Sequence, residues 1–258
     1  MSIFTTADKP VITVMVNART EQRAIDLIRM SMDQGADAFG IQMDRMLRSE
    51  RTKDTVKHLV DACEGKPLYL TNYAGDQNKG LSYEQLAQEL IEAADDGAAL
   101  IDIPADFYRS MPHQVAYQED VVDRQIELIR QIHQHGAEVL MSSHTYCFLN
   151  TQEVMKIAEA HRYRGADISK IVIWANSEEE LYMNMATELE LRRSFRMRHL
   201  FLSANTMARP HRVIGPLMGS CMYLTIYEKD DVAAQCQPLL RDAFQILNAA
   251  GMSLSSHS

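Results

Sequence analysis

The sequence predicts a single (β/α)8 TIM barrel, and three observations support that prediction. Eight short apolar runs alternate with longer segments of helical spacing along the whole chain. The runs are apolar on both faces, as in parallel strands that helices cover. No G-x-G-x-x-G follows the first run and no Pro- or Ser-rich linker divides the chain. A closed barrel that forms one domain over residues 1–258 is therefore favoured over a doubly wound open sheet.

The eight apolar runs are the expected strands of this barrel. They are VITVMV (11–16), DAFGIQM (37–43), PLYLTNY (67–73), AALIDI (98–103), EVLMSS (138–143), ISKIVIW (168–174), HLFLSA (199–204) and CMYLTIY (221–227). Their β-branched and aromatic residues favour extended structure. Only the segment 107–119 is irregular, and we expect a loop or an additional turn there.

Helical spacing of apolar residues recurs between the expected strands. Five segments show it clearly, at residues 20–35, 82–97, 119–136, 151–165 and 231–251. Each of them ends in a glycine, which suits the left-handed conformation that closes a helix. Ser82 and Thr151 are the expected N-caps of two of these helices, because Glu or Gln follows in the first turn.

Composition excludes several classes of protein. The 258-residue chain has a formal net charge of −9, so we expect no nucleic-acid partner. No stretch approaches the roughly 18 apolar residues of a membrane span, and the N-terminal segment lacks the features of a signal peptide. The four cysteines are scattered without a C-x-x-C pair, which predicts reduced thiols in a cytoplasmic protein. No histidine or cysteine motif indicates a metal site, and we expect no cofactor.

A lysine interrupts the apolar strand within DISKIVIWANS (167–177). Because side chains alternate along a strand, Ile168, Lys170 and Val172 share one face, which we expect to line the barrel interior. Burial disfavours the ammonium form, and a neutral amine can attack a carbonyl carbon to form a Schiff base. Lys170 could equally extend to solvent or pair with a carboxylate, so both interpretations stay open at this point.

A histidine follows the preceding strand, in EVLMSSH (138–144). Active sites of (β/α)8 barrels form at the C-terminal ends of the strands, and neighbouring strand ends lie side by side. His144 is therefore expected beside Lys170, where an imidazole suits general acid/base catalysis near neutral pH. A lone histidine at a strand end is more often a hydrogen-bonded surface residue, and the pairing with Lys170 is what favours the catalytic interpretation.

These residues and their order resemble the type I 3-dehydroquinate dehydratase family, the Schiff-base enzymes of the shikimate pathway of aromatic amino acid biosynthesis. The likeness runs from VITVMV to ILNAAG. It is strongest in VLMSSHTY (139–146) and ADISKIVIW (166–174), and ARPHRVIGPLMGS (208–220) is similar to the family's stretch with an arginine ahead of Gly-Ser. The resemblance implies a lyase that eliminates water from a small cyclic hydroxy ketone, and it favours a homodimer.

Roles follow from the resemblance by position. It implies that Lys170 forms the imine, and that His144 removes the α proton and later protonates the departing hydroxyl. Arg212 matches the arginine that holds the substrate carboxylate, a task for which a guanidinium is suited because it binds carboxylates bidentately. Gln235 matches the glutamine of the substrate-covering loop.

The chain departs from the family pattern around the substrate. Gln42-Met43-Asp44 stands where the family has Glu-x-Arg, and Tyr73 stands where its third strand ends in arginine. Two arginines are thereby lost, and Asp44 adds a negative charge. The partner of His144 is Asp76 or Gln77 by position. The sequence thus supports imine chemistry more strongly than it supports 3-dehydroquinate as the substrate.

Three functions remain open from the sequence. The leading one is a dehydratase that acts on a cyclic β-hydroxy ketone such as 3-dehydroquinate. The second is a class I aldolase-like or other imine-based lyase that acts on a different ketone. The third is a non-catalytic descendant of the family, against which the presence of both Lys170 and His144 speaks.

Overall fold

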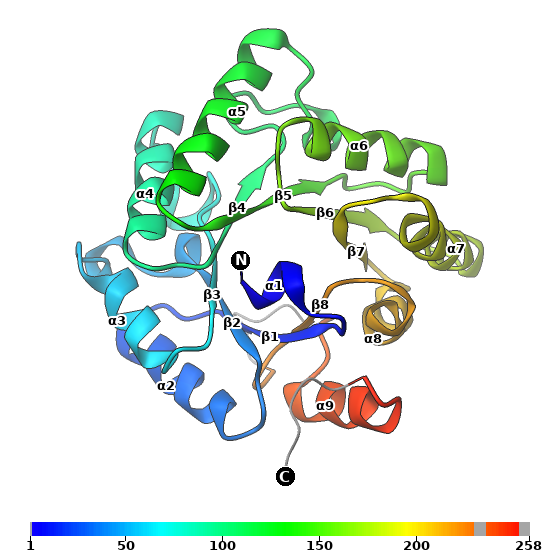
Figure 1. The fold of residues 1–258 in the computed structure, drawn as a ribbon, viewed down its shortest axis with the longest axis horizontal. Coiled ribbons are helices and arrows are strands. Elements are labelled where there is room, and N and C mark those ends of the chain that lie inside the picture. Colours follow the sequence, from blue (N-terminus) through cyan, green and yellow to red (C-terminus); the bar gives the residue numbers. More distant parts are fainter. Residues whose placement is uncertain (1, 230–235, 253–258) are drawn as a thin grey trace.

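Eight parallel strands form a nearly closed barrel (Figure 1) in a computed structural model that describes residues 2–229 and 236–252. The strands are β1 (Val11–Val16), β2 (Ala38–Gln42), β3 (Leu68–Thr71), β4 (Leu100–Pro104), β5 (Glu138–His144), β6 (Ile168–Trp174), β7 (Arg198–Ala204) and β8 (Met222–Thr225). Their order around the sheet is β7-β6-β5-β4-β3-β2-β1-β8. All eight predicted strands are present, and the predicted (β/α)8 barrel is confirmed.

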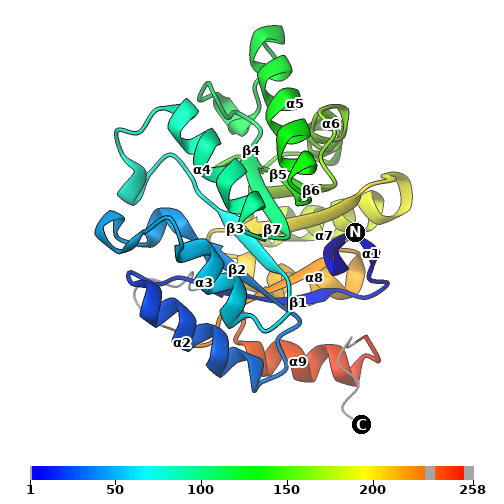
Figure 2. The ribbon, with the colours of Figure 1, turned by 60° about the vertical axis from the view of Figure 1, so that its left-hand side comes forward.

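Helices surround the strands and follow them in alternation (Figures 1 and 2). The α-helices are α1 (Ile3–Thr6), α2 (Glu21–Met32), α3 (Thr55–Ala62), α4 (Tyr83–Asp95), α5 (Glu119–Gln134), α6 (Thr151–Tyr163), α7 (Glu178–Ser194), α8 (Ala208–Met218) and α9 (Leu240–Ala249). Single 3-10 turns are η1 (Met43–Arg45), η2 (Arg48–Glu50), η3 (Asp76–Asn78) and η4 (Pro112–Gln114). Within residues 2–229 and 236–252, no helix has the length and apolarity needed to cross a bilayer.

Local hydrogen bonds fix the helix ends close to the predicted positions. Ser82 caps α4, and its capping box with Gln85 confirms that prediction. The cap of α6 is Asn150 rather than Thr151, because the Asn150 side chain accepts from the backbone N–H of Glu153 at 3.1 Å. The five predicted closing glycines all have positive φ, between 68° and 101°. Only glycine adopts that conformation without steric cost.

The last helix begins later than the sequence predicts. The described part of segment 231–251 becomes helical only at Leu240. The preceding residues run beside the end of β8, where Ile226 donates to the Pro238 carbonyl at 3.0 Å and accepts from Leu240 N at 2.9 Å. These bonds hold the chain extended just before Leu240, so the predicted helix is wrong over residues 236–239, and residues 231–235 lie outside the described structure.

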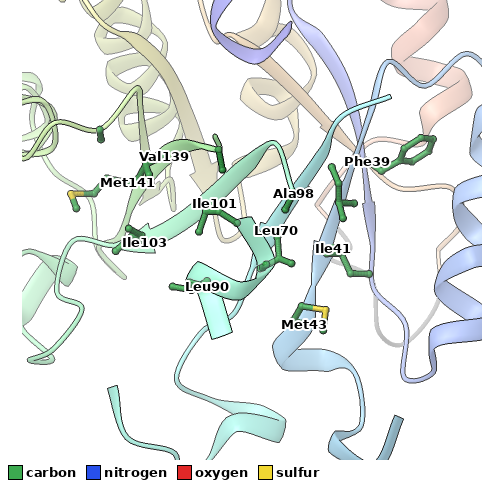
Figure 3. Close-up of a cluster of buried hydrophobic side chains, with 14 of the residues drawn as sticks. Phe39, Ile41, Met43, Leu70, Leu90, Ala98, Ile101, Ile103, Val139 and Met141 are labelled. Carbon is green, nitrogen blue, oxygen red and sulfur yellow. The ribbon is translucent and has the colours of Figure 1, made fainter. Parts of the chain in front are cut away.

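Buried apolar side chains form two layers, one inside the barrel and one between strands and helices. Ile168 and Val172 belong to the inner layer, whereas Ile171 and Ile173 belong to the outer one. Figure 3 shows part of the outer layer, in which apolar side chains of β2, β3, β4 and β5 lie together with Leu90 of α4. The face that carries Lys170 is therefore the interior face, as predicted.

The short helix α1 lies across the N-terminal end of the barrel (Figure 1). Phe4 is fully buried and packs with the inner layer. The Ser2 backbone N–H donates to Glu138 Oε1 at 2.9 Å, which fastens the helix to the start of β5. One end of the barrel is thus covered, and the interior side chains open toward the other end.

Candidate active site

Lys170 projects from β6 into the barrel interior and is only 6% exposed. Its Nζ lies 3.0 Å from Asp102 Oδ2 of β4, and it donates to the hydroxyls of Tyr69 at 3.1 Å and Tyr73 at 3.0 Å. Three acceptors match the three protons of an ammonium group. The Asp102 carboxylate supplies the counter-charge for this group. The sequence left open whether Lys170 pairs with a carboxylate, and the structure shows that it pairs with Asp102.

Asp102 is the anionic centre of this cluster. Burial would raise the pKa of its carboxyl, but the Lys170 ammonium and hydrogen bonds from Ser142 and Tyr69 lower that pKa overall. Ser142 Oγ donates to Oδ1 at 2.5 Å and the Tyr73 hydroxyl donates to Oδ2 at 2.8 Å. The carboxylate is therefore charged at neutral pH and accepts several donors at once.

The two tyrosines remain donors in this environment. Burial, together with the Asp102 charge, raises the pKa of Tyr69 and of Tyr73 well above the ordinary value. Gly40 of β2 makes room for Tyr69, because a Cβ at this position would lie 2.9 Å from the Tyr69 ring and 2.4 Å from the Met15 sulfur. A larger residue at position 40 would displace the ring that positions the Lys170 contact.

His144 lies at the C-terminal end of β5, with its ring edge against Tyr73 at a centroid distance of 5.7 Å. Gln114 Oε1 accepts from the His144 backbone N–H at 2.7 Å and lies 2.9 Å from Nδ1. Because that oxygen is an acceptor, Nδ1 carries the proton and Nε2 keeps its lone pair. Burial, with a smaller effect of the Lys170 charge, lowers the pKa of His144 to about 3. The imidazole is thus neutral at pH 7 and can accept a proton.

Gln114 is a candidate site residue that the sequence did not reveal. Asp76 was one of two expected partners of His144, but its carboxylate pairs with Arg19 at 3.3 Å and with Arg45 at 3.2 Å. Gln114 lies in η4, inside the segment predicted to be irregular, and has a φ of 50°. The irregularity of that segment was the only signal, and it gives no indication of which side chain turns inward.

A cavity of about 490 Å³ opens beside this cluster. Of the predicted substrate residues, Gln42, Asp44 and Tyr73 line it together with His144 and Gln114. Lys170 is not a lining residue, but it donates to the hydroxyl of Tyr73, which is one. The three positions at which the sequence departs from the family pattern therefore lie together around one cavity.

The described wall of the cavity carries two acidic side chains and one basic side chain. Asp44 and Asp106 line it, and burial raises the pKa of both carboxyls. Arg45 is the cation of the described wall, and it already contacts Asp76 at 3.2 Å and Asp44 at 3.9 Å.

The other two predicted substrate residues, Arg212 and Gln235, are not among the described residues that line the cavity. Arg212 is buried on α8 and donates from Nε to the Ser203 carbonyl at 2.6 Å. Its charge contributes to the lowered pKa of His144, so it acts electrostatically on the same end of the barrel. Gln235 lies outside the residues that the structure describes.

Comparison with protein-family models identifies the family of this chain. The model described as type I 3-dehydroquinase matches residues 12–253. The chain belongs to this family.

Solved structures of the same family have the same fold. The 3-dehydroquinate dehydratase from Geobacillus kaustophilus has 16% identity and a TM-score of 0.79, over 96% of this chain and 93% of that chain. The type I enzyme from Clostridium difficile, solved with covalently modified comenic acid, has 18% identity and a TM-score of 0.80, over 95% and 94%. The dehydratase from Enterococcus faecalis has 18% identity and a TM-score of 0.74, over 93% and 94%. A search of curated protein sequences found no match.

Burial of His161 makes the stability of this family member depend on pH. His161 lies between Ser143 and Ser169, at 2.9 and 2.8 Å. Burial, followed by the Arg164 charge, lowers its pKa from 6.5 to about 3, and the pKa of His144 is equally low. Between these values the unfolded chain binds protons that the folded chain does not. Each histidine should therefore remove about 1.4 kcal/mol of unfolding free energy per pH unit as pH falls from 6.5.

Urea unfolding of the wild type and of His161→Gln between pH 4.5 and 7 measures this effect. The variant should be less stable at pH 7, because one serine loses its partner, but its stability should fall less steeply on acidification. Parallel pH dependences of the two proteins would contradict the assignment of His161 as a buried neutral histidine.

Proposed function

We propose that this chain is an imine-forming dehydratase that eliminates water from a cyclic β-hydroxy ketone, with 3-dehydroquinate as the first candidate substrate. The observation that supports this most directly is the cluster of Lys170, Asp102, Tyr73 and His144 at the C-terminal end of the barrel. It combines a nucleophile, a fixed negative charge and a neutral base beside one cavity.

Imine formation is assigned to Lys170. One ammonium proton passes to the ketone oxygen as the resulting amine attacks the ketone carbon. The hydroxyl so formed leaves as water with a second proton from the nitrogen, which gives a protonated imine. Asp102, which lies 3.0 Å from Nζ and is held by Ser142, can neutralise the positive nitrogen of this intermediate as it neutralises the ammonium. A fixed carboxylate in a buried site stabilises such a charge without reorganisation.

Elimination is assigned to His144. Its neutral Nε2 takes the proton α to the imine, and the electron pair moves toward the positive nitrogen to give an enamine. Collapse of the enamine expels the β-hydroxyl, which leaves as water after it takes the proton from His144. Hydrolysis of the remaining imine returns Lys170 and consumes the water that was released when the imine formed. The net reaction is loss of one water from the substrate.

The cavity supports a substrate that is rich in hydroxyl groups. Gln42, Tyr73 and Gln114 offer neutral hydrogen-bonding groups, and Arg45 is the cation of the described wall. A substrate carboxylate would depend on Arg212, whose side chain is buried at the same end. Support for 3-dehydroquinate itself therefore comes from family membership, and support for a hydroxy ketone comes from the cavity.

Turnover with 3-dehydroquinate and a panel of cyclic hydroxy ketones tests the proposal by mass spectrometry of the products. We expect a product one water lighter than the substrate. His144→Gln should lower kcat by roughly 10²- to 10⁴-fold and should still form a borohydride-reducible adduct, because imine formation belongs to Lys170. Carbon–carbon cleavage products would instead favour the aldolase-like function, and the absence of both adduct and turnover would favour the non-catalytic descendant.

Gln114 offers a separate test of how His144 is positioned. Gln114→Ala removes the acceptor 2.9 Å from Nδ1, so the ring loses its fixed tautomer and orientation. A misplacement of about 1 Å costs roughly a hundredfold in rate, which is the loss of kcat we expect. Gln114→Glu keeps an acceptor but adds a negative charge that raises the pKa of His144, so the acid limb of the pH–rate profile should move to higher pH. An unchanged profile in Gln114→Glu would show that Gln114 does not act through His144.

A further inference from the structure

A second cavity, of about 540 Å³, lies at the opposite end of the barrel. Its wall is formed by the segments that precede β1, β7 and β8, so it opens at the N-terminal ends of these strands. The candidate active site is formed at the C-terminal ends. The two cavities are therefore separated by the length of the barrel, and the second one is independent of the proposed function.

Cationic side chains converge on this cavity. Lys9, Arg192, Arg196 and Arg198 line it, and Asp8 is the acidic residue of the described lining. This local excess of positive charge occurs in a chain whose formal net charge is −9. Clefts lined by charge of one sign concentrate counter-ions of the opposite sign.

The three arginines are not neutralised by carboxylates within the described chain. Arg192 Nη1 donates to the Met218 carbonyl at 3.3 Å, and Arg198 Nη2 donates to the Ala7 carbonyl at 2.6 Å. No ion pair to a described carboxylate is found for either of them or for Arg196, whereas most other arginines of the described chain have one, such as Arg193 with Glu190 at 2.5 Å. These guanidinium groups therefore keep donors and charge available for a ligand.

One of these donors is buried without a partner. Arg198 Nε has no hydrogen-bond partner within the described structure, although solvent does not reach it. A buried donor without an acceptor costs free energy, which an anionic ligand would recover. Glu188, a buried carboxylate near Gly219, makes its contacts elsewhere: His199 lies 3.0 Å from one oxygen, and Ser220 donates to the other at 3.2 Å.

Backbone geometry also keeps the wall of the cavity in place. Gly219 precedes β8 and lines the cavity, and a Cβ there would lie 2.9 Å from Arg192 Cβ. Any side chain at position 219 would push Arg192 away from the wall. The glycine therefore permits the close approach of α7 to the end of α8 that brings Arg192 to the cavity.

We propose that this cavity at the N-terminal end of the barrel binds a small multivalent anion that carries phosphate groups. Phosphate is preferred because each phosphate group carries up to about two negative charges where a carboxylate carries one, and three guanidinium groups, which bind its oxygens in pairs, surround one cavity. The volume exceeds that needed for a single phosphate, so the ligand class is a small molecule with two phosphate groups or with one phosphate on a larger body.

Calorimetric titration of the full chain with inorganic pyrophosphate at low ionic strength tests this proposal. We expect saturable binding of one pyrophosphate per chain. Arg196→Gln should weaken it about tenfold or more, and this variant should fold normally because no hydrogen bond or ion pair within the described residues involves Arg196. Arg192→Gln should act in the same direction. Arg193→Gln is the matched control, since it removes the same charge from the same helix outside the cavity and should leave affinity within about twofold.

Three results would overturn the proposal. The first is the absence of saturable heat with pyrophosphate. The second is an equal loss of affinity in Arg193→Gln and Arg196→Gln, which would indicate a general charge effect. The third is binding of citrate as tight as that of pyrophosphate, which would show that the cavity does not prefer phosphate groups over carboxylates.

Discussion

Lys170→Ala should abolish both covalent capture of a ketone and turnover. In the wild type, incubation with 3-dehydroquinate and borohydride should add one reduced ligand to the mass of the intact chain. The variant should add none, because its replacement has no amine to form an imine. Turnover should fall on the order of 10³-fold or more, as it does when a covalent nucleophile is removed from other enzymes.

The matched control is Lys156→Ala, which removes an exposed lysine of α6. This variant should keep the adduct and the activity of the wild type, and its adduct should map to the peptide that contains Lys170. The thermal transition of Lys170→Ala must also be measured, because Asp102 loses its cationic partner. A folded Lys170→Ala variant that still forms a full adduct would exclude Lys170 as the nucleophile.

Most of the fold was predictable because each strand, and each of five helices, carries a signal in its own stretch of sequence. The eight strands are buried on both faces and therefore appear in the sequence as short apolar runs. The closing glycines and the cap at Ser82 are equally local signals. The start of α9 was not predictable in this way, because the bridge between Ile226 and Leu239 is a contact between distant segments that overrides helical spacing.

Within the candidate site, only residues whose polarity differs from that of the surrounding strand were predictable from the sequence. Lys170 is a charge within an apolar run, and His144 is a polar residue at a strand end. Tyr69 is different, since within LYL it resembles an ordinary core residue, and only the structure brings its hydroxyl to 3.1 Å from Lys170 Nζ. Gln114 comes from an irregular segment, where the direction of a side chain depends on backbone angles that no periodicity reports.

Asp102→Asn should be the most destabilising single substitution in this cluster. It leaves the buried Lys170 ammonium without its counter-charge, and breaking one side of a buried pair typically costs about 3–5 kcal/mol. Lys170→Met should cost less, because Asp102 keeps hydrogen bonds from Ser142 and Tyr73. Urea unfolding at pH 7 measures both. Asp44→Asn is the control: burial raises the pKa of this carboxyl, so its charge does not stabilise the fold and its removal should cause no comparable loss.

The double variant Asp102→Asn/Lys170→Met separates pairing from packing. If the ion pair is the dominant interaction, the loss of unfolding free energy in the double variant should be markedly smaller than the sum of the losses in the two single variants. The reason is that the double variant leaves no unpaired charge. The dependence on pH should agree, since the folded-state pKa of Asp102 lies below 3.8. Its stabilising contribution is present above that value and is lost as pH falls through the folded-state pKa, so the deficit of Asp102→Asn should shrink in strong acid. Additive single effects, or a deficit that is unchanged by acid, would show that the buried ion pair does not hold Lys170 in place.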